Sequence, residues 1–388
     1  MSQRGPTGTY IRASTTGEVV RAFVPHPLPP DPPLVIAAAI RDRLDRALIA
    51  LGRLDSITTL LPNPELFLYS YVRKEAVVSS QIEGTQSSLS DLLLFEIEAA
   101  PGVPIADVVE VSNYVAALEH GLERIRAGFP LSNRLIREMH EILMRRGRGA
   151  ETHPGHFRTT QNWLGGASIA DAVFVPPPAE RVPECMAALE RFLHDEPERS
   201  PTLTKAALAH VQFETIHPFL DGNGRLGRLL VPLVLHTDGV LGQPLLYLSL
   251  YFKRRRGEYY AHLNRVRTDG DWEAWLAFFA EGVTEIAEGA VSTAKRLVTL
   301  VQDGRERIRG VGRGAATALQ VHEALQREPV TTIPRLARHT GLSVPGATAA
   351  LGRLVGLGLV AEVSGRQRGR VYSYEPYLRL LSEGTEPL

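Results

Sequence analysis

Apolar residues recur every three or four positions along most of the 388-residue chain, which is the spacing of one face of an α-helix. Proline and glycine clusters interrupt this pattern at intervals that fit the ends of separate helices. The pattern therefore predicts a mainly α-helical protein. The expected helices cover residues 36–54, 65–81, 87–95, 108–127, 132–146, 182–194, 203–216, 224–235, 256–267 and 272–301.

Two stretches before residue 300 lack the helical period. Residues 1–33 are rich in proline, glycine and threonine, which predicts an extended arm on the surface rather than a folded unit. Between 147 and 178, a Gly165-Gly166 pair precedes the run 168–175, and three prolines end it. This second stretch predicts a small β-hairpin, or flap.

The pattern changes again after the glycine-rich residues 304–314. Three short helical patterns are followed by two strand-like runs, an order that resembles a winged helix-turn-helix domain. These helices are expected over 315–326, 333–339 and 345–356, and the strands over 359–363 and 371–374. The chain then divides into an extended arm (1–33), an N-terminal helical region (34–105), a helical core (106–300), a linker (301–314) and a winged-helix domain (315–388).

Composition bears on the compartment and on the partners of the chain. Lysine plus arginine equals aspartate plus glutamate at 43 each, so no overall charge attracts the chain to nucleic acid or to a membrane. The single Cys185 excludes an intramolecular disulfide and fits a reducing compartment. The N-terminus has no apolar signal segment, and polar residues break the most apolar run, 226–250. We expect a cytoplasmic protein with no membrane partner.

The segment 217–228 concentrates residues that suit chemistry on phosphate groups. It reads His-Pro-Phe-Leu-Asp-Gly-Asn-Gly-Arg-Leu-Gly-Arg and lies between two helical patterns, so it predicts a loop that leads into a helix N-terminus. Glycines let backbone N–H groups converge on an anion, and the helix dipole favours the same anion. The candidate phosphate-binding residues are Asp221, Gly222, Asn223, Gly224, Arg225, Leu226, Gly227 and Arg228.

Individual side chains in this segment have distinct uses. His217 can accept a proton from an attacking hydroxyl. Asp221 offers the hard oxygen ligand that a phosphate-bound Mg²⁺ needs. Arg225 and Arg228 are three positions apart, so they share one helix face and suit bidentate phosphate binding. The alternative is a glycine-rich turn with a solvated arginine pair, which the specificity of the whole pattern disfavours.

The segment resembles the Fic family signature, His-Pro-Phe-x-Asp/Glu-Gly-Asn-Gly-Arg-x-x-Arg, at every fixed position. The resemblance implies a Fic helical core and, over 106–300, a catalytic domain. Such a domain transfers AMP from ATP to a Ser, Thr or Tyr hydroxyl of a target protein, or of the chain itself. The resemblance also implies His217 as the catalytic base, Mg²⁺ held by Asp221, and nucleotide binding by residues 221–228.

A second segment, Ser79-Ser80-Gln81-Ile82-Glu83-Gly84, resembles the inhibitory motif Ser/Thr-x-x-x-Glu-Gly/Asn of many Fic proteins. The resemblance implies an inhibitory role for Ser79, Glu83 and Gly84, with Glu83 paired to Arg228. An arginine that holds a carboxylate cannot also hold a γ-phosphate, so ATP would bind in an unreactive position. The alternative is an ordinary helix end with a solvated glutamate.

The resemblance extends to the flap and to a tyrosine pair. Residues 167–178 would form the family's flap, which binds a target segment in extended form, with Val173 and Phe174 as target-binding residues. Tyr259 and Tyr260 would lie at the adenine pocket. Amphipathic core tyrosines are the alternative for both.

Other functions stay open at this point. Glu83 could orient a water that removes AMP from a modified protein, and another nucleotide could be the donor. A non-enzyme alternative is a DNA-binding regulator whose Fic core only senses nucleotide. Arg366, Arg368 and Arg370 would share a strand face suited to a DNA backbone. Winged helices also serve protein contacts and dimerisation, so DNA binding and a homodimer both stay open.

Overall fold

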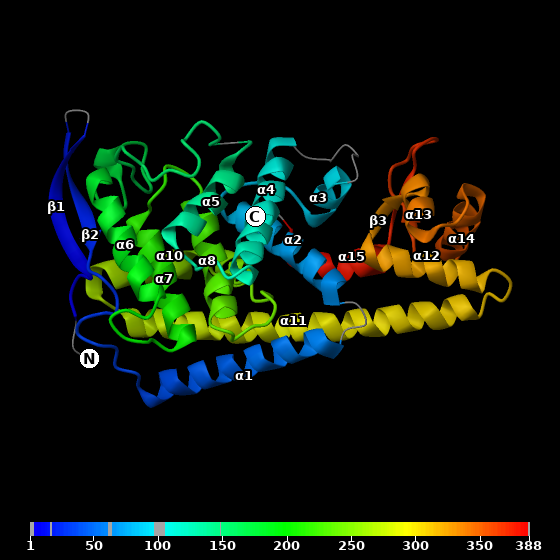
Figure 1. The fold of residues 1–388 in the computed structure, drawn as a ribbon, viewed down its shortest axis with the longest axis horizontal. Helices are drawn as coiled ribbons and strands as arrows, with labels where there is room; N and C mark the ends of the chain where they lie inside the picture. The colour runs from blue at the N-terminus through cyan, green and yellow to red at the C-terminus, as the bar shows by residue number, and fades with distance from the viewer. Residues whose placement is uncertain (1–3, 16–17, 61–63, 97–104, 148, 387–388) are drawn as a thin grey trace.

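The structure is a computed structural model that describes residues 4–15, 18–60, 64–96, 105–147 and 149–386. A helical body and a smaller C-terminal domain lie at opposite ends of an elongated molecule (Figure 1). The expected mainly helical fold is confirmed. The boundary expected at Pro101–Pro104, between the N-terminal region and the core, lies outside the described residues.

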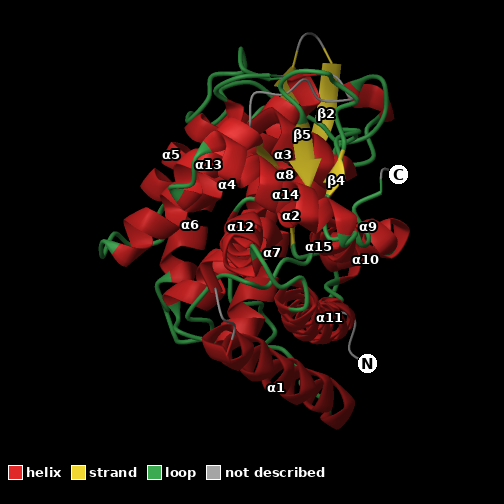
Figure 2. Ribbon diagram, turned by 90° about the vertical axis from the view of Figure 1, so that its right-hand side faces the viewer, coloured by secondary structure: helices red, strands yellow, loops and turns green. Residues whose placement is uncertain are grey.

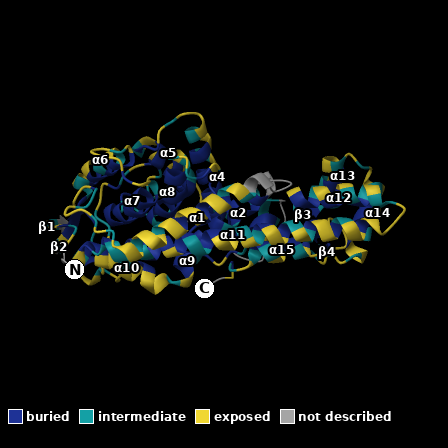
Figure 3. Ribbon diagram, turned by 90° about the horizontal axis from the view of Figure 1, so that it is seen from below, coloured by how far each residue is buried: buried dark blue, intermediate teal, exposed yellow. Residues whose placement is uncertain are grey.

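The body is built around two buried helices, α7 (Thr202–Ile216) and α8 (Asn223–Thr237). Nearly every residue of both is buried, including charged ones such as Lys205 and Arg228 (Figure 3). They contact α2 (Pro64–Ile82), α4 (Ile105–Arg126), α5 (Asn133–Met144), α6 (Val182–Leu193) and α10 (Arg256–Asp269). Helices α3 (Leu89–Glu96) and α9 (Ser249–Arg254) pack on α2. Short 3-10 turns lie at η1 (Ile169–Asp171) and η2 (Ala179–Arg181).

Two long helices support this body from below. Helix α11 (Trp272–Arg309) runs along the molecule, and α1 (Ala38–Leu60) packs beside it (Figures 1 and 2). The expected helix end at 301 is wrong, because α11 continues through Gly304. A side chain at 304 would collide with His322 and approach the hydroxyl of Tyr374. Gly304 therefore permits close packing inside a helix, and most of the expected linker 301–314 is helical.

The N-terminal arm is a paired structure rather than a single extended strand. Strands β1 (Gly8–Thr15) and β2 (Glu18–Pro25) form an antiparallel hairpin, visible at the edge of the body in Figure 1. Phe23 is fully buried, with its ring against Tyr10 at 5.1 Å and Phe174 at 5.9 Å between centroids. The expectation of an arm without folded structure was wrong, because apolar residues of β2 pack against the body.

The C-terminal domain has the expected winged-helix order. Helices α12 (Ala315–Arg327), α13 (Ile333–Thr340) and α14 (Val344–Gly356) pack beside a small antiparallel sheet. The sheet has the order β3 (Val330–Thr332), β5 (Val371–Ser373), β4 (Ala361–Glu362). A last helix, α15 (Glu375–Ser382), then returns to the body and packs on α2, α3 and α11.

The wing arginines do not form the strand face that the sequence suggested. Arg366, Arg368 and Arg370 are exposed, but they lie in the irregular tip between β4 and β5. The Arg370 side chain donates to the carbonyl of Arg366 at 3.1 Å, so the tip folds back on itself. Alternation in the sequence therefore does not place these three side chains on one strand face. In the described ranges, no helix is long and apolar enough to cross a membrane.

Candidate active site

The signature segment forms a tight loop between two buried helices. Helix α7 ends at His217 in a left-handed conformation, and Gly222, with φ of 77°, caps the start of α8. The Asn223 side chain accepts from the N–H of Phe219 at 2.9 Å and donates to its carbonyl at 2.8 Å. Because Asn223 closes the loop in this way, the first N–H groups of α8 remain available for an anion.

His140 on α5 fixes the same loop, and sequence reasoning missed it. Its Nδ1 accepts from the N–H of Gly155 at 2.9 Å, so the proton is on Nε2, which donates to the carbonyl of Asp221 at 3.0 Å. The ring stacks on Phe219 with centroids 3.7 Å apart. Burial lowers the pKa of His140 to about 4, and Arg225 adds to this effect. His140 therefore stays neutral, and nothing in its sequence neighbourhood marked it.

The His217 side chain is also neutral near pH 7. Burial lowers its pKa to about 3, and the nearby guanidiniums of Arg158 and Arg267 act in the same direction. Glu83 and the carbonyl of Glu214 oppose them. A neutral imidazole next to the anion loop has a nitrogen lone pair that can accept a proton, and the role of His217 as a base stays a prediction.

A second residue that the sequence analysis did not select is Arg158. Its guanidinium is buried and donates to the carbonyls of His217 at 2.9 Å, Pro177 at 2.5 Å and Thr160 at 3.2 Å. The carbonyl of His217 belongs to the signature loop, and that of Pro177 to the flap. Arg158 thus connects the loop and the flap through their backbone carbonyls.

Arg225 lies between two carboxylates. Its guanidinium is 3.3 Å from Glu110 of α4 and 3.4 Å from Oδ1 of Asp221, and its side chain is almost fully buried. The same Asp221 oxygen accepts from the N–H of Gly222 at 2.5 Å. These contacts hold Arg225 at the N-terminal turn of α8, where a bound phosphate would meet both the arginine and the free N–H groups.

Arg228 makes the contact expected from the inhibitory motif. Its guanidinium donates to Glu83 at 2.6 Å, to the hydroxyl of Ser79 at 2.8 Å and to the carbonyl of Ser79 at 2.9 Å. Burial alone would raise the pKa of Glu83, but the ion pair with Arg228 holds it below its usual value. The Glu83 carboxylate also lies against Gly224, where a side chain would collide with it. Glu83 therefore occupies the approach to the first turn of α8.

The remaining expected residues divide between the surface and the core. Val173 is 77 % exposed on the flap, whereas Phe174 is buried beside Phe23. The centroid of the Phe174 ring is 3.9 Å from Cζ of Arg267. The flap has a single β-bridge, between Leu164 and Phe174, rather than a full hairpin. Only Val173 of the expected pair is therefore presented to solvent.

The two tyrosines also differ. Tyr259 is buried, and its hydroxyl bonds to Nε2 of His210 at 2.9 Å, as expected for a core tyrosine. Tyr260 is 43 % exposed, and Glu83 is one of the groups that raise its pKa, after burial. Leu226 and Gly227 are buried within α8, behind the loop. Tyr260 is thus the member of the pair that an incoming base can reach.

Asp221 is the residue that could hold a metal ion. Across the residues that the structure describes, no group of three or more histidine, cysteine or acidic side chains converges on one point. Mg²⁺ at phosphate sites needs only one or two carboxylates, because water and substrate phosphates complete its shell. The Asp221 side chain is 40 % exposed at the mouth of the loop, which fits that kind of site.

Comparison with known protein families gives three matches along the chain. Residues 41–123 match the Fic/DOC family N-terminal region, and residues 130–235 match the Fic/DOC family itself. Residues 316–361 match a winged helix-turn-helix DNA-binding family. In chain order, these matches cover the N-terminal helices, the region that contains the signature loop, and the C-terminal domain.

Curated relatives share part of the chain. The protein adenylyltransferase fic-1 of Caenorhabditis briggsae is 33 % identical over 147 residues, which are 38 % of this chain and 26 % of that protein. The protein adenylyltransferase Fic of Drosophila grimshawi is 34 % identical over 128 residues, or 33 % of this chain and 24 % of that protein. The chain thus spans about a quarter of the length of these relatives.

Solved structures share the fold. A Fic family protein from Desulfovibrio desulfuricans superposes with a TM-score of 0.59 at 23 % identity, covering 88 % of this chain and 97 % of that one. A fragment of Fic-1 from Caenorhabditis elegans superposes with a TM-score of 0.53 at 25 % identity, covering 68 % and 74 % respectively. The agreement in the first case extends over most of the chain, so it includes more than the catalytic loop.

Proposed function

We propose that this Fic-domain protein, with its Fic N-terminal region and C-terminal winged helix-turn-helix domain, transfers AMP from ATP to a protein hydroxyl. One observation carries the proposal. A neutral His217 lies beside a helix N-terminus whose first two turns bear two buried arginines, Arg225 and Arg228. The names of the curated relatives support the same activity.

The reaction follows from this arrangement. His217 accepts the proton of the target hydroxyl, whose oxygen then attacks the α-phosphorus of ATP. The bond between the α-phosphorus and the bridging oxygen breaks, and pyrophosphate leaves. The N–H groups at the start of α8 and the Arg225 guanidinium bind phosphate oxygens and stabilise the developing charge. Asp221 would hold a Mg²⁺ ion, which supplies further positive charge to the phosphates.

In this proposal, Glu83 restrains the activity. The Nε and Nη2 groups of Arg228 donate to Ser79 and Glu83, so this edge of the guanidinium is already occupied and cannot bind a γ-phosphate as a fork. The Glu83 carboxylate also lies over Gly224, and its charge repels a phosphate from that side. ATP bound against this pair would hold its α-phosphorus away from His217.

Labelled nucleotide tests the proposed transfer. The full chain is incubated with Mg²⁺ and ATP labelled at either the α- or the γ-phosphate, alone and with a lysate. We expect covalent label from the α-position only, and mass spectrometry should find one added AMP on a Ser, Thr or Tyr. His217→Ala is the control and should remain unlabelled. Stable label from the γ-position, or label that persists in the control, would contradict the proposal.

Removal of AMP is the second candidate function, and the position of Glu83 favours it. The carboxylate is close enough to His217 to raise its pKa, so it could orient a water at the same phosphorus. An AMP-modified protein would then lose its label in the presence of wild type, but not with Glu83→Gly. If Glu83→Gly instead gains transfer activity and wild type removes nothing, this candidate is excluded.

A further inference from the structure

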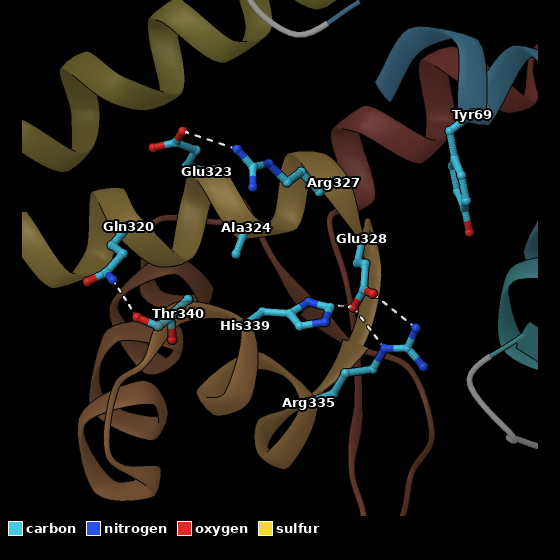
Figure 4. Close-up of a pocket in the computed structure, with 9 residues that line it drawn as sticks. All are labelled: Tyr69, Gln320, Glu323, Ala324, Arg327, Glu328, Arg335, His339 and Thr340. Carbon is cyan, nitrogen blue, oxygen red and sulfur yellow. Dashed lines mark hydrogen bonds and ion pairs between the residues drawn. The ribbon is translucent and has the colours of Figure 1, made fainter. Parts of the chain in front are cut away.

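The winged-helix domain contacts the inhibitory helix α2 in two different ways. Near Tyr69 of α2, the two parts do not pack tightly. A cleft of about 480 Å³ lies there between α2 and helices α12 and α13 (Figure 4). The charged groups in the cleft pair within the winged helix, with Glu328 bound by Arg335 at 2.8 Å and by His339 at 3.3 Å. This part of the interface leaves room for the domain to move.

The second contact is a tight one made by α15 and the residues that follow it. The carboxylate of Glu383 accepts two bonds from Arg296 of α11, at 2.7 and 2.6 Å. The carbonyl of Glu383 accepts from Lys74 of α2 at 2.6 Å. Residue 383 is therefore fixed to both the long support helix and the inhibitory helix.

Gln81 of α2 is the centre of this contact. Its side chain is 1 % exposed, and its amide donates to the carbonyls of Thr385 at 2.8 Å and Ser87 at 2.9 Å. Its oxygen accepts from Lys253 at 2.7 Å, and Lys253 also donates to the carbonyl of Glu386. Thr385 itself is buried. A buried amide with all of these partners strongly favours one position of the helix end.

This position is the one that places the inhibitory carboxylate. Gln81 lies between Ser79 and Glu83, the two residues that bind Arg228. The C-terminal segment 383–386 thus contacts the side of α2 at the residue flanked by the two inhibitory contacts. A shift of the segment would break the bond of Gln81 to Thr385 and the bond of Lys74 to Glu383, both in the C-terminal half of the helix whose end carries Glu83.

We propose that residues 383–386 form a strap that holds α2 in its inhibitory position, so that the winged-helix domain controls the Fic site through α15. The proposal rests on the proposed function for its effect on activity, but not for its effect on α2. An event that moves the winged helix across the open cleft would pull α15, loosen the strap and release Glu83 from Arg228. The catalytic loop itself is untouched by this movement.

A chain that ends after Ser382 tests the strap. Hydrogen exchange of the backbone amides over 79–84 should be faster than in the full chain. Incorporation of AMP should rise about fivefold or more, the lower end of typical coupling between sites. In a Glu83→Gly background, the same shortening should add nothing, because the strap acts through Glu83. Unchanged exchange over 79–84 overturns the proposal, whatever the activity.

A full-length variant guards against misfolding of the shortened chain. Lys74→Met combined with Arg296→Ala removes both anchors of Glu383, and it should reproduce the faster exchange and the gain in activity. Arg368→Ala, an exposed substitution in the same domain, is the matched control and should change neither. If no variant, including Glu83→Gly, incorporates AMP, the proposed transfer fails, while exchange over 79–84 still decides the strap. Equal exchange in the anchor variant and the control overturns the strap.

Discussion

The catalytic loop and the inhibitory helix end meet at α8, but they are held by different kinds of contact. The loop is fixed by buried groups that bind its backbone: Asn223 closes it, His140 binds the carbonyl of Asp221, and Arg158 donates to the carbonyl of His217. The helix end depends on an ion pair, between Glu83 and Arg228, and on a segment more than 300 residues away in sequence. Hydrogen bonds to buried backbone groups have no competitor in solution, whereas the carboxylate of an ion pair can be exchanged for a phosphate.

Under the proposed function, this difference separates the groups that act in transfer from the groups that restrain it. Substitutions at the loop should lower activity, because they disturb groups that act on the substrate. Substitutions at the helix end should raise it, because they remove a competitor for Arg228. The following experiments test that separation.

The largest expected effect is at His217. His217→Ala removes the group that accepts the hydroxyl proton, so the rate of AMP incorporation should fall by roughly two to four orders of magnitude. Fluorescent ATP should bind with nearly the wild-type affinity, since the phosphate-binding groups remain. Rate measurements at saturating ATP check the prediction, and a variant that retains a tenth of wild-type activity would contradict it.

Asp221 should show the next largest effect. Asp221→Ala removes the oxygen ligand proposed for Mg²⁺, so activity should fall, and the Mg²⁺ concentration for half-maximal rate should rise roughly 10- to 100-fold. Asp171→Ala, which removes an exposed flap carboxylate, is a control of the same chemistry. An Mg²⁺ titration of Asp221→Ala that superposes on wild type would place the metal elsewhere.

His140 acts as a positioning residue, so its effect should be smaller. His140→Phe keeps the stacking on Phe219 but leaves the carbonyl of Asp221 and the N–H of Gly155 without a partner. Loss of such a buried partner costs about 1–3 kcal/mol, which corresponds to a roughly 5- to 160-fold lower rate if the whole cost falls on the transition state. The kcat should fall while KM for the target changes little.

His140→Gln provides the matched comparison, because an amide can both donate and accept. Recovery of kcat in the glutamine variant, with a similar melting temperature for both variants, supports a positioning role. Equal loss in the two variants would contradict a positioning role that acts through these two hydrogen bonds.

The smallest expected effect on activity is at His210 of α7, where the prediction concerns the pH dependence of stability. Burial lowers its pKa to about 4, whereas an unfolded histidine has a value near 6.5. Between these values the unfolded state binds the extra proton, so the stability contributed by neutral His210 is lost as pH falls from 6.5 to about 4. The loss should approach about 1.4 kcal/mol per pH unit in that window.

Urea unfolding at several pH values measures this loss. His210→Gln cannot titrate, so its stability should change less steeply over the window than that of wild type. Identical slopes for the two proteins would contradict the assignment of a depressed pKa to His210.

Much of the fold and of the site could be predicted from the sequence. Helical periodicity located most helices, because each buries one face against neighbours. The signature located His217, Arg225 and Arg228 around one loop, because the three residues lie close together in sequence. The contact between Glu83 and Arg228 was also expected, from the resemblance of a short motif.

The features that sequence reasoning missed depend on distant partners. His140 becomes important only because Gly155 and Asp221 meet it in space. Gly304 resembled a helix breaker, yet it lies where His322 leaves no room for a side chain. The β1–β2 hairpin is stabilised by packing against Phe174, which no local pattern could reveal. Buried long-range contacts decide such details.

The central claim is that Glu83 inhibits transfer by occupying Arg228. The direct test is the initial rate of AMP incorporation, at saturating ATP and Mg²⁺, for wild type, Glu83→Gly, Arg228→Ala and the double variant. We predict a rate for Glu83→Gly about 5- to 150-fold above wild type, and a double variant that is no faster than Arg228→Ala alone. A rate for Glu83→Gly equal to or below wild type, or a double variant that retains the full gain, would contradict the claim.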